Sequence, residues 1–431
     1  MSTAGPGQDG TSHLRQVLGA AAVSAGLRLR RPTAAGALSQ EEAAATAAAW
    51  GILPDDDRGP RAGGGTVVVL VDGLGLENLR ARKGHAPTLR SWLSGAEADA
   101  GAPGPEARTC LPSTTAAALS TLGTGALPGT TGMVGYSVLS PLAARERLAG
   151  RRPCREDQLS LISWEGHGLD PRAWQDVPTV FERLERDPGR PRRTDGQSAP
   201  LAVTIGPARF AGSGLTLAGL RGAAHRGADR MEDRPGLAVR ALAQGVPLVY
   251  LYVGELDHAG HAHGWRSAQW LTQLERLDAV LSELVRRVPR GTRVLLTADH
   301  GMVDTDADHR VDLSADPVLA RDVVAVAGEP RFTHLHVTAA APAVAAETAA
   351  RWRERLGDRA LWVGTRDEAH TLLGPLSERA HSVVGDVVVA MAGSWVLVDP
   401  RVHSPEAIAM PGVHGSLTAQ ETTIPLLVTR A

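Results

Sequence analysis

The sequence predicts an α/β fold in which helices cover both faces of a mostly parallel central sheet. Three short apolar runs, rich in β-branched residues, occupy residues 66–71, 247–253 and 293–297. Continuous runs of this kind are typical of strands buried on both faces. Between the second and third runs, apolar residues recur every three or four positions over residues 267–288, which predicts a helix. Strands that alternate with helices form parallel βαβ units.

The same patterns divide the chain into four parts. Residues 1–65 are expected to form an N-terminal extension, partly disordered and then helical, because the capping box at residues 39–42 precedes an alanine-rich stretch. Residues 66–304 form the predicted α/β core, which carries the candidate catalytic residues. Short strand-like runs and one helical stretch predict an inserted, smaller α+β subdomain at residues 305–395. Residues 396–431 are expected to return to the core.

Composition gives no reason to expect a nucleic-acid polymer or a membrane as partner. The formal net charge is −2 over 431 residues, so the chain lacks the basic surplus that polyanions attract. No apolar stretch approaches the roughly 20 residues of a membrane span, and no signal peptide is evident, so we expect a cytoplasmic protein. Cys110 and Cys154 are too few for a disulfide framework. We expect free thiols, with a single bridge between them as the alternative.

Acidic and imidazole side chains follow each of the three predicted strands. Asp72 follows the first strand, and Asp257 and His261 follow the second. Asp299 and His300 follow the third. Parallel strands bring their carboxyl ends to one edge of a sheet, where α/β proteins bind their ligands. A lone aspartate such as Asp72 is more often a helix cap, so its interpretation as a metal ligand depends on these partners.

A sixth residue, His414, lies in a loop before another predicted strand, at residues 423–428. Carboxylate and imidazole ligands suit Zn²⁺, and three protein ligands per ion leave a position open for substrate. Two such ions about 4 Å apart can stabilise both the entering and the leaving oxygen of an in-line displacement. The six residues therefore predict a two-metal site for phosphoryl transfer.

Thr115, in the segment Pro-Ser-Thr-Thr-Ala at residues 112–116, is the candidate nucleophile. Because it precedes an alanine-rich helix, its local sequence alone favours a capping role. A helix N-terminus also offers backbone N–H groups and a positive dipole end to a phosphate oxygen. A hydroxyl bound to a metal ion there would ionise readily enough to act as a nucleophile. Ser113 and Thr114 are the alternative nucleophiles.

Taken together, these segments resemble the alkaline phosphatase superfamily, and within it the nucleotide pyrophosphatase/phosphodiesterase (type I phosphodiesterase) family, over residues 67–427. The resemblance implies an alkaline-phosphatase-like fold and two divalent metal ions, expected to be Zn²⁺, with Mn²⁺ or iron as the alternative for one of them. It assigns three ligands to each ion: Asp257, His261 and His414 to the first, and Asp72, Asp299 and His300 to the second. The second ion would also bind the Thr115 oxygen. The neighbouring His258 and His263 match no ligand position of the family.

The resemblance implies a hydrolase of small-molecule phosphate esters or nucleotides, which acts as a phosphodiesterase or nucleotide pyrophosphatase through a phosphothreonine at Thr115. The sequence departs from the family at Tyr136, where an asparagine normally donates to a phosphate oxygen. Loss of one such donor costs about 10²–10³ in rate in other enzymes, although a phenol can donate instead. A phosphomonoesterase or a phosphonate hydrolase of the same superfamily is therefore an alternative. A metal-binding protein without catalysis is the alternative from another class.

Overall fold

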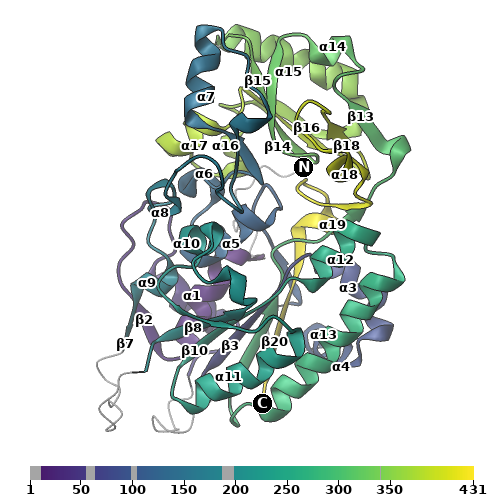
Figure 1. Ribbon diagram of the computed structural model, residues 1–431. Coiled ribbons are helices and arrows are strands. Elements are labelled where there is room, and N and C mark those ends of the chain that lie inside the picture. Colours follow the sequence, from purple (N-terminus) through teal and green to yellow (C-terminus); the bar gives the residue numbers. More distant parts are fainter. Residues whose placement is uncertain (1–10, 55–63, 99–103, 187–198, 340) are drawn as a thin grey trace.

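The computed structural model describes residues 11–54, 64–98, 104–186, 199–339 and 341–431. Within them, two sheets of four or more strands lie in different parts of the molecule (Figure 1). The larger sheet has eight strands, which are, in spatial order, β1 (Ser12–His13), β4 (Glu106–Arg108), β20 (Thr423–Arg430), β11 (Arg293–Thr297), β3 (Thr66–Val71), β10 (Leu248–Val253), β8 (Ala202–Gly206) and β9 (Ala224–Gly227).

The larger sheet is mostly parallel, as predicted. β3 pairs in parallel with β10 on one side and with β11 on the other. In this register Val71 lies opposite Val253, and Leu70 lies opposite Thr297. The carboxyl ends of the three strands therefore lie at the same edge. β20 runs antiparallel to β11, so the segment that precedes β20 also reaches this edge.

Two groups of helices cover the larger sheet (Figure 1). The first comprises α1 (Leu14–Ser24), α5 (Thr115–Thr124) and α10 (Gly214–Gly219), and the second comprises α4 (Pro87–Ala98), α11 (Arg234–Ala243) and α13 (Ala268–Arg287). The helix predicted at residues 267–288 is α13, and the Ser267 hydroxyl caps it by accepting a hydrogen bond from the Trp270 N–H. Its apolar stripe, which includes Leu274, Leu277 and Leu281, is buried. All six residues of β3 are buried as well, which explains their uninterrupted apolar character.

Within residues 1–65, for which we expected an extension, residues 11–54 pack against the larger sheet and its helices. β1 pairs with β4 in the larger sheet, and α1 packs against α5 and β3. Leu14, Val17 and Leu18 of α1 have no exposed surface. The helix that was predicted after residue 39 exists as α2 (Gln40–Ala49), capped by Ser39. Residues 1–10 and 55–63 lie outside the described residues.

The smaller sheet consists of four antiparallel strands in the order β14 (Val323–Glu329), β15 (Phe332–Val337), β17 (Val387–Met391) and β16 (Ala360–Thr365). All four strands lie within residues 305–395, and α15 (Pro342–Leu356) packs against β16 and β17. An earlier segment also contributes, because β5 (Ser137–Leu139) contacts β14. In addition, Arg147 and Asp386 form a buried ion pair of 2.8 Å. The sequence patterns gave no sign of this earlier contribution.

The two ends of the segment that carries the smaller sheet lie side by side. β12 (Val303–Asp304) pairs with β19 (Gly412–Val413), and β13 (Arg310–Asp312) pairs with β18 (Val396–Val398). A buried ion pair of 2.7 Å joins Arg331 to Glu421, which belongs to α19 (Ala419–Thr422), just before β20. These contacts hold the smaller sheet against the edge of the larger sheet that carries the strand ends.

Both cysteines are free thiols, as expected, with Cys110 buried and Cys154 exposed. Within the part of the chain that the structure describes, no helix combines the length and the apolar character needed to cross a membrane.

Candidate active site

The six predicted ligands converge at the carboxyl edge of the larger sheet. Asp72 follows β3 directly, and Asp299 and His300 follow β11 after one intervening residue. Asp257 and His261 lie on α12 (Glu255–His263), the helix that begins after β10. Their spacing of four residues puts both side chains on one face of this helix. The sixth residue, His414, follows β19 directly.

Asp257, His261 and His414 form the first cluster, with one ligand atom from each residue within 4.8 Å of the others. The Nε2 atom of His261 lies 3.4 Å from Asp257 Oδ1 and 3.2 Å from His414 Nε2. His414 Nε2 lies 3.7 Å from the same carboxylate oxygen. Ligands about 2.0–2.1 Å from a tetrahedral Zn²⁺ ion are roughly 3.3 Å apart. The spacing of this cluster therefore fits one ion of that size.

Asp72, Asp299 and His300 form the second cluster, and all three side chains are buried. His300 Nε2 lies 3.4 Å from Asp72 Oδ1 and 3.3 Å from Asp299 Oδ2. The rings of His300 and His414 stack with their centroids 3.6 Å apart. The two clusters are therefore immediate neighbours, as a two-metal site requires.

The histidine rings are oriented by backbone carbonyl groups. The Nδ1 atoms of His261, His300 and His414 lie 2.8 Å from Gly412 O, 3.1 Å from Gly301 O and 3.0 Å from Ser113 O, respectively. A carbonyl can only accept, so each Nδ1 carries the proton in the neutral ring. Each Nε2 then directs a lone pair into its cluster, the tautomer that a metal-ligating histidine needs.

Each carboxylate of the site has one oxygen without a hydrogen-bond partner. Asp72 Oδ1, Asp257 Oδ1 and Asp299 Oδ2 are buried and accept no hydrogen bond. Burial, and then the charges of Asp299 and Asp257, raise the pKa of Asp72 well above its ordinary value. Burial also raises the pKa of Asp299. Buried, unpaired carboxylates are costly, and bound divalent cations would remove that cost. The donor set therefore fits two divalent ions.

Thr115 is the first residue of α5, and its hydroxyl faces the second cluster. Its Oγ1 atom lies 3.2 Å from His300 Nε2. The alternative nucleophiles are engaged elsewhere, because Ser113 is buried and donates to Ser416 O at 2.7 Å. Thr114 is buried, and its hydroxyl lies close enough to Glu329 to lower the pKa of that carboxyl. Among these three hydroxyl groups, the geometry favours Thr115.

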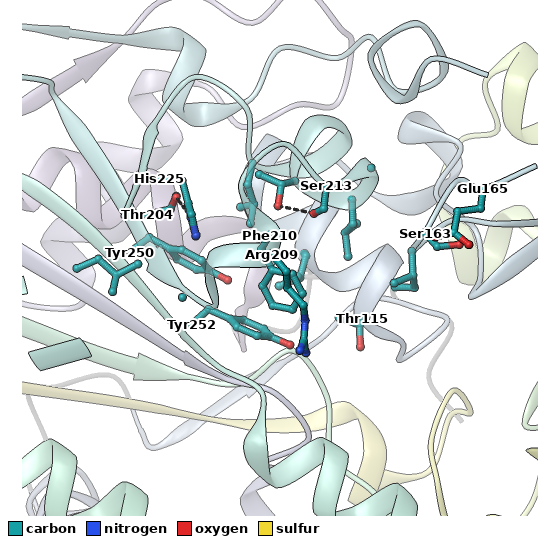
Figure 2. Close-up of a pocket in the computed structure, with 18 residues that line it drawn as sticks. Thr115, Ser163, Glu165, Thr204, Arg209, Phe210, Ser213, His225, Tyr250 and Tyr252 are labelled. Carbon is teal, nitrogen blue, oxygen red and sulfur yellow. Dashed lines mark hydrogen bonds between the residues drawn. The ribbon is translucent and has the colours of Figure 1, made fainter. Parts of the chain in front are cut away.

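A pocket of about 420 Å³ extends from Thr115 over the ends of β8 and β10. Figure 2 shows Thr115 at one side and Thr204 and His225 at the other, with Phe210 and Tyr252 between them. Much of the lining is apolar, and its aliphatic side chains are Leu119, Ile162, Ile205, Leu215 and Leu220. A cavity of this size suits a small organic group.

Two tyrosines of β10 line this pocket, and sequence reasoning identified neither. The Tyr252 hydroxyl donates to Asp72 Oδ2 at 2.5 Å, and burial raises the pKa of Tyr252 well above its ordinary value. Tyr250 is also buried, and its hydroxyl has no hydrogen-bond partner. The available signal was two tyrosines at alternate positions of an otherwise aliphatic strand, on the same face and just before Asp257.

Other residues considered from the sequence lie outside the two clusters. His258 and His263 are exposed, and neither belongs to a cluster. Tyr136 is 50% exposed, and its backbone N–H lowers the pKa of Glu329. Glu329, which belongs to the smaller sheet, is a further residue that sequence reasoning missed.

With this geometry established, comparison with known proteins identifies the family. The model of the type I phosphodiesterase/nucleotide pyrophosphatase family matches residues 66–417. The chain belongs to this family. The match includes all six predicted ligands and Thr115, and the chain is a hydrolase of phosphoric ester or pyrophosphate bonds.

Solved structures of hydrolases share the fold. Murine ectonucleotide pyrophosphatase/phosphodiesterase 5, in an inactive form with AMP, has a TM-score of 0.57 at 15% identity, with 84% of this chain and 87% of that chain covered. Phosphonoacetate hydrolase from Sinorhizobium meliloti 1021, with phosphonoformate, has a TM-score of 0.56 at 18% identity, with 86% and 90% covered.

A curated relative is similar only locally. The catalytic subunit of human GPI ethanolamine phosphate transferase 3 is 37% identical over 57 residues, which are 13% of this chain and 5% of that protein. The chain therefore matches only a small part of this relative.

Proposed function

We propose that the protein is a phosphodiesterase that cleaves its substrate at a two-metal site with Thr115 as nucleophile. The observation that carries this proposal is the position of the Thr115 hydroxyl, 3.2 Å from His300 Nε2. His300 belongs to the second cluster, and its ring stacks on His414 of the first. A phosphate group bound across both clusters would therefore present its phosphorus to this hydroxyl.

The residues of the chain support a double displacement. Thr115 Oγ1 would lose its proton and attack phosphorus in line as the P–O bond to the leaving group breaks, which releases the leaving alcohol and forms a phosphothreonine that keeps the second substituent. Water would then attack phosphorus, break the bond to Oγ1 and release the phosphate monoester, and Thr115 would regain its proton. Two inversions predict retention of configuration at phosphorus. The free N–H groups at the start of α5 favour a phosphate oxygen there. When bound, two Zn²⁺ ions would neutralise phosphate charge and lower the pKa of the attacking hydroxyl.

The pocket beside Thr115 supports a diester over a monoester. Thr115 lies at one side of this pocket, and the first cluster, which we assign to the leaving oxygen, is not part of its lining. An organic substituent that stays on phosphorus would therefore enter the pocket. A phosphate monoester has no such substituent, so the apolar lining would remain unused.

Phosphonate hydrolysis is the second candidate, favoured by Tyr136 at the position of the family asparagine. A phosphonate monoester also keeps an organic group on phosphorus and would use the same pocket. The structural likeness to phosphonoacetate hydrolase is compatible with this alternative.

The test compares initial rates of the zinc-loaded protein on bis-p-nitrophenyl phosphate, p-nitrophenyl phosphate and p-nitrophenyl phenylphosphonate. We expect the diester to be preferred over the monoester, and Thr115→Ala to lose turnover by about 10³-fold or more while it keeps its metal. Faster hydrolysis of the phosphonate would favour the second candidate. Normal turnover in Thr115→Ala would overturn the mechanism.

A further inference from the structure

A carboxyl group from the smaller sheet lies directly behind the nucleophile. Glu329 is the last residue of β14, and it is 6% exposed. Its carboxyl lies close enough to the hydroxyl of Thr114, the residue before the nucleophile, and to the backbone N–H of Tyr136 for both groups to lower its pKa. Glu329 therefore connects the smaller sheet to the start of α5.

The same side chain packs against the loop that carries His414. A Cβ atom added to Gly415 would lie 2.7 Å from the Glu329 Cγ atom, closer than two carbon atoms can approach. Gly415 has a φ of +129°, which also favours glycine. The carbonyl oxygen of Gly415 accepts a hydrogen bond from Ser113 N–H at 3.1 Å. Glu329 thus lies beside both the nucleophile segment and the loop that carries His414.

Burial of this carboxyl is costly for the fold. One of its oxygens, Oε1, has no hydrogen-bond partner, and an unsatisfied buried polar atom destabilises a fold. Burial raises the pKa of Glu329 to about 8, against the effect of Thr114 and Tyr136. Glu421, whose charge also raises this pKa, is already paired with Arg331. An apolar side chain would fill the space at lower cost, so stability does not explain a glutamate here.

We propose that Glu329 is a positioning residue of the hydrolytic site, which sets Thr115 relative to His414 by holding Thr114 on one side and packing on Gly415 on the other. This inference rests on the proposed function. It assigns a catalytic contribution to the smaller sheet, which supplies neither a metal ligand nor the nucleophile. It also identifies a group that fixes the segment around Tyr136, where the chain departs from its family.

Glu329→Gln and Glu329→Leu test the proposal in the zinc-loaded protein with bis-p-nitrophenyl phosphate. A displacement of about 1 Å can cost on the order of 10²-fold in rate, so we expect Glu329→Leu to lower kcat by about 10- to 100-fold. KM should change less than about twofold, because Glu329 makes no substrate contact. Glu329→Gln, which keeps the shape and an acceptor oxygen, should recover most of the rate. Glu347→Leu, an exposed change on α15, is the matched control and should behave as wild type.

A double-mutant cycle with Thr114→Val distinguishes positioning from general destabilisation. If Glu329 acts through Thr114, the kcat losses of Thr114→Val and Glu329→Leu are not additive. Zinc stoichiometry should stay unchanged in all these variants. Should Glu329→Leu fail to fold, Glu329→Ala combined with Thr114→Val provides the same cycle.

Three results would overturn the inference: a wild-type kcat in Glu329→Leu, an effect on KM alone, or additive losses in the cycle. In each case the wild-type enzyme remains active and the proposed function stands. Absence of turnover in the wild type itself, on every ester, would instead remove the proposed function and this inference together.

Discussion

The Nε2 atoms of His261 and His414 face each other at 3.2 Å, and neither can donate a proton to the other. Each ring donates its Nδ1 proton to a backbone carbonyl oxygen. His261 donates to Gly412 O, and His414 donates to Ser113 O. Two lone pairs at this distance repel unless a cation lies between them. This arrangement supports the prediction of a metal ion between the two rings.

Metal content is the first prediction that follows. We expect two zinc ions per chain by elemental analysis, and about one in His414→Ala, because the second cluster keeps all of its ligands. Chelation should abolish hydrolysis and lower Tm, since buried carboxylates would lose their counter-ions. Fewer than two tightly bound ions in the wild type would contradict the two-metal interpretation.

Tyr252 should tune the second metal site through Asp72. Tyr252→Phe removes the donor that lies 2.5 Å from Asp72 Oδ2. Loss of such a partner to a metal ligand typically costs about 10- to 100-fold in metal affinity or activity. Competition with a chromogenic chelator measures the affinity. Tyr250→Phe is the matched control two residues away on the same strand, because the Tyr250 hydroxyl has no partner and its loss should leave zinc affinity unchanged.

The pocket should select the group that stays on phosphorus. Bis-p-nitrophenyl phosphate and methyl p-nitrophenyl phosphate share one leaving group and differ in the retained substituent. Burial of an aromatic ring gives about 2–3 kcal/mol, so we expect kcat/KM to favour the aryl diester by roughly 30- to 100-fold beyond any difference in chemical reactivity. Ile162→Trp, at a half-buried lining position, should reduce this preference. An unchanged preference in that variant would place the aryl group elsewhere.

Acid should destabilise the protein through His334. Burial lowers the pKa of this residue from 6.5 to about 4, against the effect of its hydrogen bond to Val134 O. Its Nε2 donates to Val134 O, and its Nδ1 accepts from Gly385 N–H. The unfolded chain binds a proton below pH 6.5, whereas the folded chain does so only near pH 4. The contribution to stability is therefore complete above pH 6.5 and is lost as the pH falls to about 4, by about 3 kcal/mol.

The measurement is the unfolding free energy of wild type and His334→Gln at pH 7 and pH 4. The difference in unfolding free energy between the two proteins should be smaller at pH 4 than at pH 7 by about 3 kcal/mol. The contribution of His414, whose pKa burial also lowers, cancels in the comparison. A difference independent of pH would show that His334 is not the responsible group.

Local sequence predicted those parts of the molecule that local forces determine. β3, β10 and β11 are buried on both faces, and their apolar composition indicates this burial. The ligands that follow these strands could therefore be placed at one edge of the sheet. α1 was missed because alanine fills much of its buried surface, which weakens the periodic signal. Tyr252 and Glu329 were missed for another reason. Their partners, Asp72 and Thr114, lie 180 and 215 residues away in sequence, and only the folded chain brings them together.

The pairing of β12 with β19, and of β13 with β18, holds together the two ends of the segment that carries the smaller sheet. Because its entry and exit are adjacent, this segment can be lengthened, shortened or replaced during evolution without a break in the larger sheet. Such an exchange would also replace Glu329, the group behind the nucleophile. Relatives could therefore diverge in catalytic behaviour through a region that contributes none of the predicted metal ligands.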